Sequence, residues 1–151
     1  GVFFSKKKWY PCFYAVRRQG GAFEEAYENG TVSRMAKKIY DIVSGGKIAM
    51  NEIKQVGGFH REDNAKFERA IVVLQMRMFI TICGRAQKRN KYGEGYSWNS
   101  TVFATVEDFW SERGCSIPDL DPSRSYDKIK AQILKLNPEA ERKKVDNFIK
   151  G

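Results

Sequence analysis

Apolar residues recur at two spacings along the chain, and the change between them divides the sequence. Between residues 31 and 79 they recur every three or four positions, which is typical of helices that bury one face. From about residue 78 to 106 they alternate with polar residues, which is typical of strands. Beyond Pro118 and Pro122 the helical spacing returns. The pattern therefore predicts helices, then a β-hairpin, then further helices.

The region 31–79 predicts three helices separated by glycines. The first lies in TVSRMAKKIYDIVSGG, residues 31–46, and a short extended segment follows at 47–49. A helix of about two turns then ends at the glycine pair 57–58, since glycine favours helix ends. REDNAKFERAIVVLQMRMF, residues 61–79, carries one apolar stripe and predicts the third helix.

The strand-like region reads as a β-hairpin. MFITICGR and YSWNSTVFATV are rich in β-branched and aromatic residues, and the polar segment QKRNKYGEG between them predicts a long loop. The order helix, short strand, helix, helix, hairpin is that of a winged helix, a helix-turn-helix variant. We therefore predict an α+β, mainly helical fold, with a helical core over 31–78 and a wing over 78–106.

The flanking segments predict additional helices. A short helix over 11–18 is expected to begin at Pro11, and AFEEAY predicts another. SYDKIKAQILKL predicts a helix near the C-terminus, and a last one is expected to open with Asn137 as cap and Pro138 in its first turn, so that the two fold back as a hairpin. The expected units are a basic aromatic N-terminal segment packed on the core, a winged-helix domain and a C-terminal helical appendage, at 1–30, 31–112 and 113–151.

The net charge of +9 is concentrated in two places. Residues 1–18 hold five bases and no acid, and residues 85–91 hold four bases and no acid; together they equal the whole net excess. A localised excess of positive charge favours binding to a polyanion, with DNA or RNA first. An acidic membrane surface fits less well, because neither stretch has the apolar face of an interfacial helix. We expect a cytoplasmic protein without a membrane partner.

The predicted hairpin tip holds the first set of candidate DNA contacts. A wing places its bases against phosphates, and nearby polar side chains donate hydrogen bonds. The candidates there are Arg85, Lys88, Arg89, Asn90, Lys91 and Tyr92. The competing interpretation is an ordinary solvated turn.

The third predicted helix supplies the second set, since the N-terminal part of such a helix enters the major groove. Its candidates are Asn64, Lys66 and Arg69. A solvated helix face remains the alternative, and the acids among these residues would oppose phosphate. They are Glu62, Asp63 and Glu68.

The sequence offers little chemistry for catalysis or for a cofactor. His60 is the only histidine, and no serine or cysteine has a partner at the spacing of a nucleophilic triad. The three cysteines are widely spaced, without a metal-binding or disulfide pattern, and suit reduced thiols of an intracellular protein. No phosphate-binding glycine loop or dinucleotide fingerprint is present. We predict no catalytic residue, metal or cofactor.

Three stretches together resemble one protein family. KKWYPCFYAVRRQGGAFEEAYENGTVSRMAKKIYDIV, GGFHREDNAKFERAIVVLQMRMFI and RNKYGEGYSWNSTVFATVEDFW are similar to the bacterial AlkZ-related winged-helix proteins, and the similarity runs from about Lys7 to Trp110 and more loosely into the tail. The family name comes from distant similarity to DNA glycosylases that unhook alkylated bases and interstrand crosslinks. The resemblance implies a winged helix and a DNA-directed role.

The resemblance does not carry over an active site. Those glycosylases use two glutamines separated by one residue, in a more N-terminal helical unit. This chain has Gln75-Met76-Arg77, which lacks the second glutamine.

Our first hypothesis is a DNA-binding winged helix without catalysis of its own, with double-stranded DNA as its partner. Two alternatives stay open. One is a fragment of a DNA-repair enzyme of glycosylase type. The other is a winged helix that binds proteins, including a second copy of itself.

Overall fold

The computed structural model describes residues 6–89, 91–93 and 95–151. Its fold is α+β and mainly helical, as predicted, with one small antiparallel sheet. In chain order its elements are α1 (Lys6–Arg18), α2 (Phe23–Glu28), α3 (Arg34–Ser44), β1 (Ile48–Ala49), α4 (Met50–Gly57), the 3₁₀ turn η1 (Arg61–Asp63), α5 (Asn64–Met76), β2 (Ile80–Arg89), β3 (Gly95–Thr105), α6 (Val106–Ser111), α7 (Pro122–Leu136) and α8 (Arg142–Lys150).

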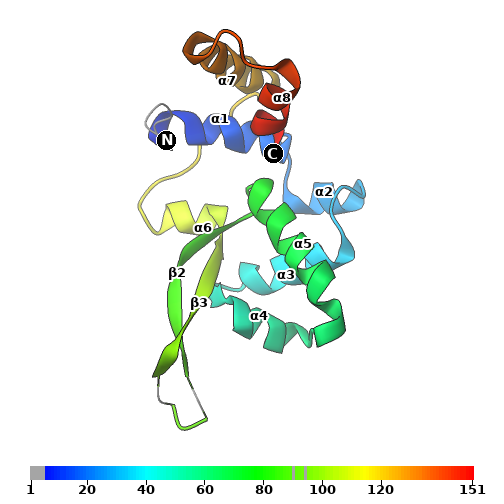
Figure 1. Cartoon of the computed structure of the whole chain (residues 1–151), viewed down its shortest axis with the longest axis vertical. Coiled ribbons are helices and arrows are strands. Elements are labelled where there is room, and N and C mark those ends of the chain that lie inside the picture. Colours follow the sequence, from blue (N-terminus) through cyan, green and yellow to red (C-terminus); the bar gives the residue numbers. More distant parts are fainter. Residues whose placement is uncertain (1–5, 90, 94) are drawn as a thin grey trace.

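The sheet has the strand order β1-β3-β2, and all pairs are antiparallel. β1 is short and pairs with β3 only at Phe103 and Val102. The far half of the hairpin is therefore a two-stranded arm that projects away from the helices (Figure 1). Cys83 has no partner in the register between Ile82 and Gly84, and such a bulge bends a strand and increases its twist.

The main core joins α2, α3, α4 and α5 to the base of the sheet. Its largest fully buried side chains include Phe23, Ile39, Phe67, Phe79 and Phe103. Phe23 stacks on Tyr40 with ring centroids 4.1 Å apart and meets the edge of Phe79 at 5.1 Å. The apolar stripes seen in the sequence thus converge on one core, which sets the positions of α5 and of the hairpin.

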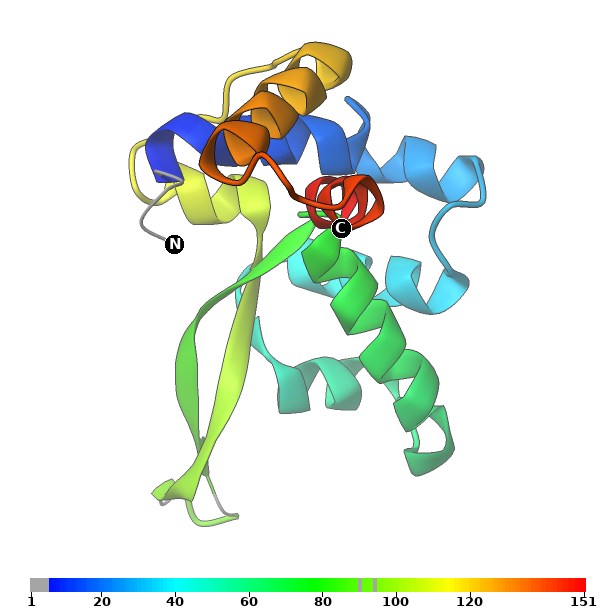
Figure 2. The ribbon, with the colours of Figure 1, turned by 45° about the horizontal axis from the view of Figure 1, so that its top comes forward.

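A second, smaller core joins the two ends of the chain. α1 packs against α7 and α8, and the buried side chains between them are Trp9, Cys12, Ile129, Val145 and Ile149. These three helices lie at the end of the molecule opposite to the hairpin tip (Figures 1 and 2). The N-terminal helix and the C-terminal helices therefore form one packed unit.

The predicted start of the first helix is wrong, because α1 begins at Lys6 and contains Pro11 in its interior. A proline there removes one backbone hydrogen bond and costs about 3 kcal/mol in an unsupported helix. The helix continues because the side chains on both sides of the proline are buried: Trp9 is 6% exposed and Cys12 is 1% exposed. Tertiary packing outweighs the local preference.

The predicted start of the last helix is also wrong, because α8 begins at Arg142. The amide of Asn137 instead makes the last hydrogen bond of α7, to the carbonyl of Ile133 at 2.8 Å. Pro138 then lies in a turn closed by the amide of Ala140 and the carbonyl of Asn137, at 3.1 Å. Asparagine followed by proline suits a turn as well as a helix start.

Candidate nucleic-acid interface

The hairpin places its basic residues over a longer stretch than predicted. β2 continues to Arg89, which pairs with Gly95. Arg85 is exposed but lies within the strand opposite Thr101, so its expected place at the tip is wrong. Lys88 and Arg89 close the strand; their side chains, and Asn90 as a whole, lie outside the described residues.

The described part of the tip presents a cation beside a ring. Lys91 and Tyr92 are both exposed, and Nζ of Lys91 lies 5.0 Å from the centre of the Tyr92 ring. Gly93 follows with φ of +79°, a conformation that favours glycine. A positive charge and an aromatic hydroxyl therefore stand at the far end of the arm, where both can reach a phosphodiester strand.

The three candidates on α5 are exposed, but they do not share one side of the helix. Phe67 and Leu74 point into the core and so fix the rotation of α5. Lys66 and Arg69 lie on the side of α5 that faces α3, where they line a groove between the two helices. Asn64 is exposed but does not line this groove. The structure thus brings two of the three together.

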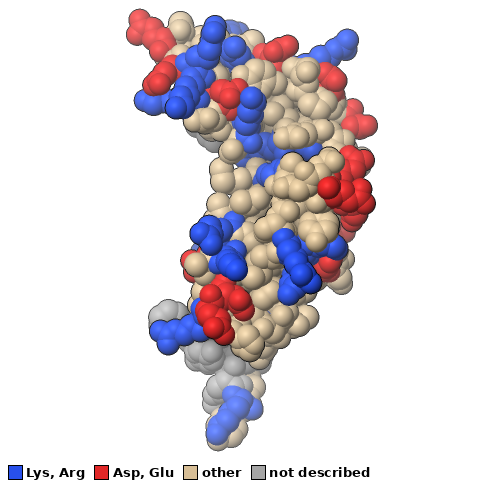
Figure 3. All heavy atoms as spheres, turned by 90° about the vertical axis from the view of Figure 1, so that its right-hand side faces the viewer, with Lys and Arg blue, Asp and Glu red and all other residues tan. Residues whose placement is uncertain are grey.

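Lys66 and Arg69 line a groove together with Arg34 and Lys38 of α3. In the side view of the surface, two groups of Lys and Arg flank an uncharged area in the middle of the molecule, and Asp or Glu lie beside each group (Figure 3). Sequence reasoning missed Arg34 and Lys38. Arg34 and Lys38 are four residues apart and so share one face of α3, away from the buried Ile39. That spacing was the signal in the sequence that could have identified them.

The outward side of α5 is more apolar than a base-reading helix requires. Val72 is 50% exposed and Met76 is 43% exposed. Glu62 and Glu68 are exposed as well. The positive charge of α5 is therefore confined to its α3 side.

Arg17, one of the N-terminal bases, is used inside the protein. Its Nε donates to the carbonyl of Ile149 at 3.2 Å, and its Nη2 donates to the carbonyl of Phe148 at 2.8 Å. Burial lowers the pKa of Arg17 from its ordinary value. This guanidinium holds the end of α8 against α1 and is not available to a polyanion.

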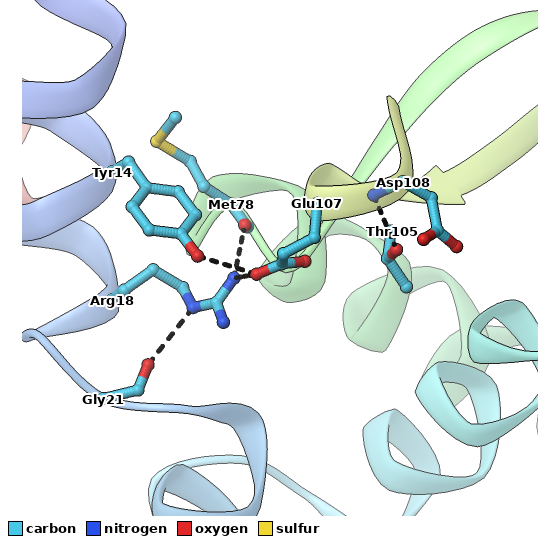
Figure 4. A network of polar contacts seen from close by, with 7 residues as sticks. All are labelled: Tyr14, Arg18, Gly21, Met78, Thr105, Glu107 and Asp108. Atoms are coloured by element: carbon cyan, nitrogen blue, oxygen red, sulfur yellow. Dashed lines mark hydrogen bonds and ion pairs between the residues drawn. The ribbon is translucent and has the colours of Figure 1, made fainter. Parts of the chain in front are cut away.

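Arg18, unlike the half-buried Arg17, is buried, at the junction of α1 and α6 (Figure 4). Its Nη1 donates to Oε1 of Glu107 at 2.7 Å and to the carbonyl of Met78 at 3.1 Å. The hydroxyl of Tyr14 donates to the same carboxylate at 2.7 Å. Burial, and next this hydrogen bond, raise the pKa of Tyr14.

A family model described as AlkZ related matches residues 2–150. The chain belongs to the AlkZ-related family. This family is distantly related to DNA glycosylases, which is consistent with a DNA-related role. Comparisons with curated proteins and with solved structures give no match.

In this AlkZ-related chain, Gln75 lines a hollow between the helical unit and β2. Its neighbours there include Tyr10, Phe13, Ile82 and Phe148. Arg77, two residues further on, turns the other way and donates from Nη1 to Oγ1 of Thr31 at 2.9 Å. Arg77 thus makes a structural contact between the end of α5 and the segment that leads into α3.

Other chemistry is sparse in the part of this AlkZ-related chain that the structure describes. His60 is exposed, and its backbone amide donates to Oδ2 of Asp63 at 2.9 Å. Within those residues, no three His, Cys, Asp or Glu side chains are grouped as metal ligands. The helices there also lack the combination of length and apolar character that a bilayer crossing requires.

Proposed function

We propose that the chain is a DNA-binding protein in which residues 31–112 form a winged helix. α5 approaches the major groove through Asn64, Lys66 and Arg69, and the hairpin binds phosphates. The order of α3, β1, α4, α5 and the hairpin supports this proposal, because it is the order of a winged helix. Membership of the AlkZ-related family supports a DNA-directed role.

The observation that carries the proposal is the projecting arm. From Ile80 to Gly93 the hairpin contains four bases and no acid. Arg85, Lys91 and Tyr92 are exposed on it. Cations on such an arm neutralise phosphates and release counterions, so binding is expected to weaken steeply as salt rises. The remaining hairpin contacts in the proposal come from Lys88, Arg89 and Asn90.

The flanking units support the winged helix in this proposal. Residues 1–30 and 113–151 supply α1, α7 and α8, which pack together and hold the base of the hairpin through Arg17 and Arg18. The partner is double-stranded DNA in the cytoplasm. The three cysteines are free, which suits that reducing compartment.

Charge reversal at the hairpin tip tests the proposal. The variant Lys88→Glu, Arg89→Glu, Lys91→Glu is expected to bind duplex DNA at least about tenfold more weakly than wild type, measured by fluorescence anisotropy at about 50 mM salt. The matched control is Lys135→Glu, Lys143→Glu, Lys144→Glu, which changes the net charge equally on exposed positions of α7 and α8. Equal affinity of the two variants would contradict the role of the hairpin.

A second candidate function is protein binding, and the exposed apolar side of α5 favours it. Val72 and Met76 lie next to each other on that side, one helical turn apart. Absence of DNA binding at low salt, together with a stable homodimer in sedimentation equilibrium, would favour this function over the first. A monomer that binds duplex DNA would exclude it as the main role.

A further inference from the structure

The groove between α3 and α5 has an uncharged floor and charged rims. Val32 and Ala70 are buried at its base, 6% and 4% exposed. Arg34 and Lys38 stand on the α3 side, and Lys66 and Arg69 stand on the α5 side; all four are exposed. Among the described residues, those that line the groove include no acid.

The four cations are not paired with acids in the part of the chain that the structure describes. Within residues 6–89, 91–93 and 95–151, none of their side chains forms an ion pair or a hydrogen bond. Lys37 provides a contrast, because its Nζ pairs with Oδ2 of Asp41 at 2.8 Å. Like charges placed around one groove repel each other, and an anion bound between them removes that repulsion.

The groove and the hairpin lie on opposite sides of α5. Gln75 faces the hairpin side, where it shares a hollow with Ile80 and Ile82 of β2. Lys66 and Arg69 face α3. A helix with its side chains is about 10–12 Å across, close to the width of about 12 Å of the major groove of B-DNA. A helix that enters that groove therefore has one phosphate strand on each side.

We infer that the groove between α3 and α5 binds the phosphodiester strand on the side of the major groove away from the hairpin. This inference rests on the proposed function, and it adds Arg34 and Lys38 of α3 to the interface. The two arginines can each engage two phosphate oxygens, whereas the two lysines act as point charges. The duplex is thus held on both sides of α5, by the groove on one and by the hairpin on the other.

A pair of substitutions on α3 tests the groove without touching α5 or the hairpin. The groove variant is Arg34→Gln, Lys38→Gln. The matched control is Lys37→Gln, Lys47→Gln, which removes the same charge from neighbouring exposed ion pairs with Asp41 and Glu112. Such surface pairs contribute little to stability, so both variants are expected to fold, which circular dichroism and the thermal midpoint verify.

Both variants and the wild type are titrated into a fluorescent duplex over a series of salt concentrations. The groove variant is expected to bind at least about tenfold more weakly than wild type at about 100 mM salt. Its plot of log affinity against log salt is expected to be less steep by about 1.8, because two phosphate contacts are lost and each contributes about 0.9 to the slope. The control is expected to keep the wild-type slope.

Each other outcome overturns the inference in a recognisable way. If the groove variant and the control weaken equally, the effect is one of net charge and the groove is not a site. If the groove variant binds like wild type, the groove inference fails while the proposed function stands. If the wild type itself does not bind duplex, the proposed function and the inference fail together.

Discussion

Arg18 donates from Nη1 to Oε1 of Glu107 at 2.7 Å and so joins the end of α1 to the start of α6. The arginine is 7% exposed, and its planar fork also reaches the carbonyls of Met78 and Gly21. One side chain therefore ties the unit formed by α1, α7 and α8 to the segment that leads into the hairpin.

Replacing Arg18 by alanine is expected to lower the free energy of unfolding by about 2–4 kcal/mol, because two carbonyls and a carboxylate lose a buried donor. Urea denaturation followed by circular dichroism measures the change. Arg18→Lys is expected to recover only part of it, since an ammonium cannot reproduce the fork. An alanine variant within about 0.5 kcal/mol of wild type would contradict this account of the junction.

Tyr14 makes the stability of the protein sensitive to alkaline pH. The pKa of its hydroxyl is raised by burial and by the hydrogen bond to Glu107, whereas in the unfolded chain it is about 10. A group whose pKa is higher in the folded state stabilises the fold below its unfolded pKa. That contribution is lost as the pH rises from about 10 through the folded pKa.

Tyr14→Phe removes this titration together with the hydrogen bond. The variant is expected to be less stable than wild type near neutral pH by about 1 kcal/mol, and its stability is expected to fall less steeply above pH 10. Burial also raises the pKa values of Tyr10 and Tyr40, so some decline will remain. Urea denaturation at a series of pH values checks this, and parallel curves for the two proteins would contradict it.

The elements built on the main core were predictable from sequence. α3 and α5 each bury one apolar stripe, and β2 and β3 show the alternation of a hairpin, so periodicity located them. The starts of α1 and α8 were not predictable. Pro11 and Asn137 each suit a helix start by local preference, but packing with distant parts of the chain decides where these helices begin. The spacing of apolar residues reflects which positions are buried, whereas a capping residue reflects only the local preference for a helix end.

The candidate interface was predictable only in part, for a similar reason. Charge counting included Arg17 and Arg18 among the bases that favour a polyanion, yet both guanidinium groups donate hydrogen bonds to backbone carbonyls of the protein. Arg34 lies far in sequence from Lys66 and Arg69, and the packing of α3 on α5 brings them to one groove. A linear pattern contains no information about that juxtaposition.

The salt dependence of duplex binding tests the central claim most directly. Wild-type protein is titrated into a fluorescent duplex of about 20 base pairs, roughly two helical turns, and affinity is measured as salt increases. Six cations on the hairpin and α5, at about 0.9 each, predict a slope near −5 in log affinity against log salt, and the α3 groove makes it steeper. Absence of binding at about 50 mM salt, or an affinity that does not change with salt, would contradict a phosphate-binding winged helix.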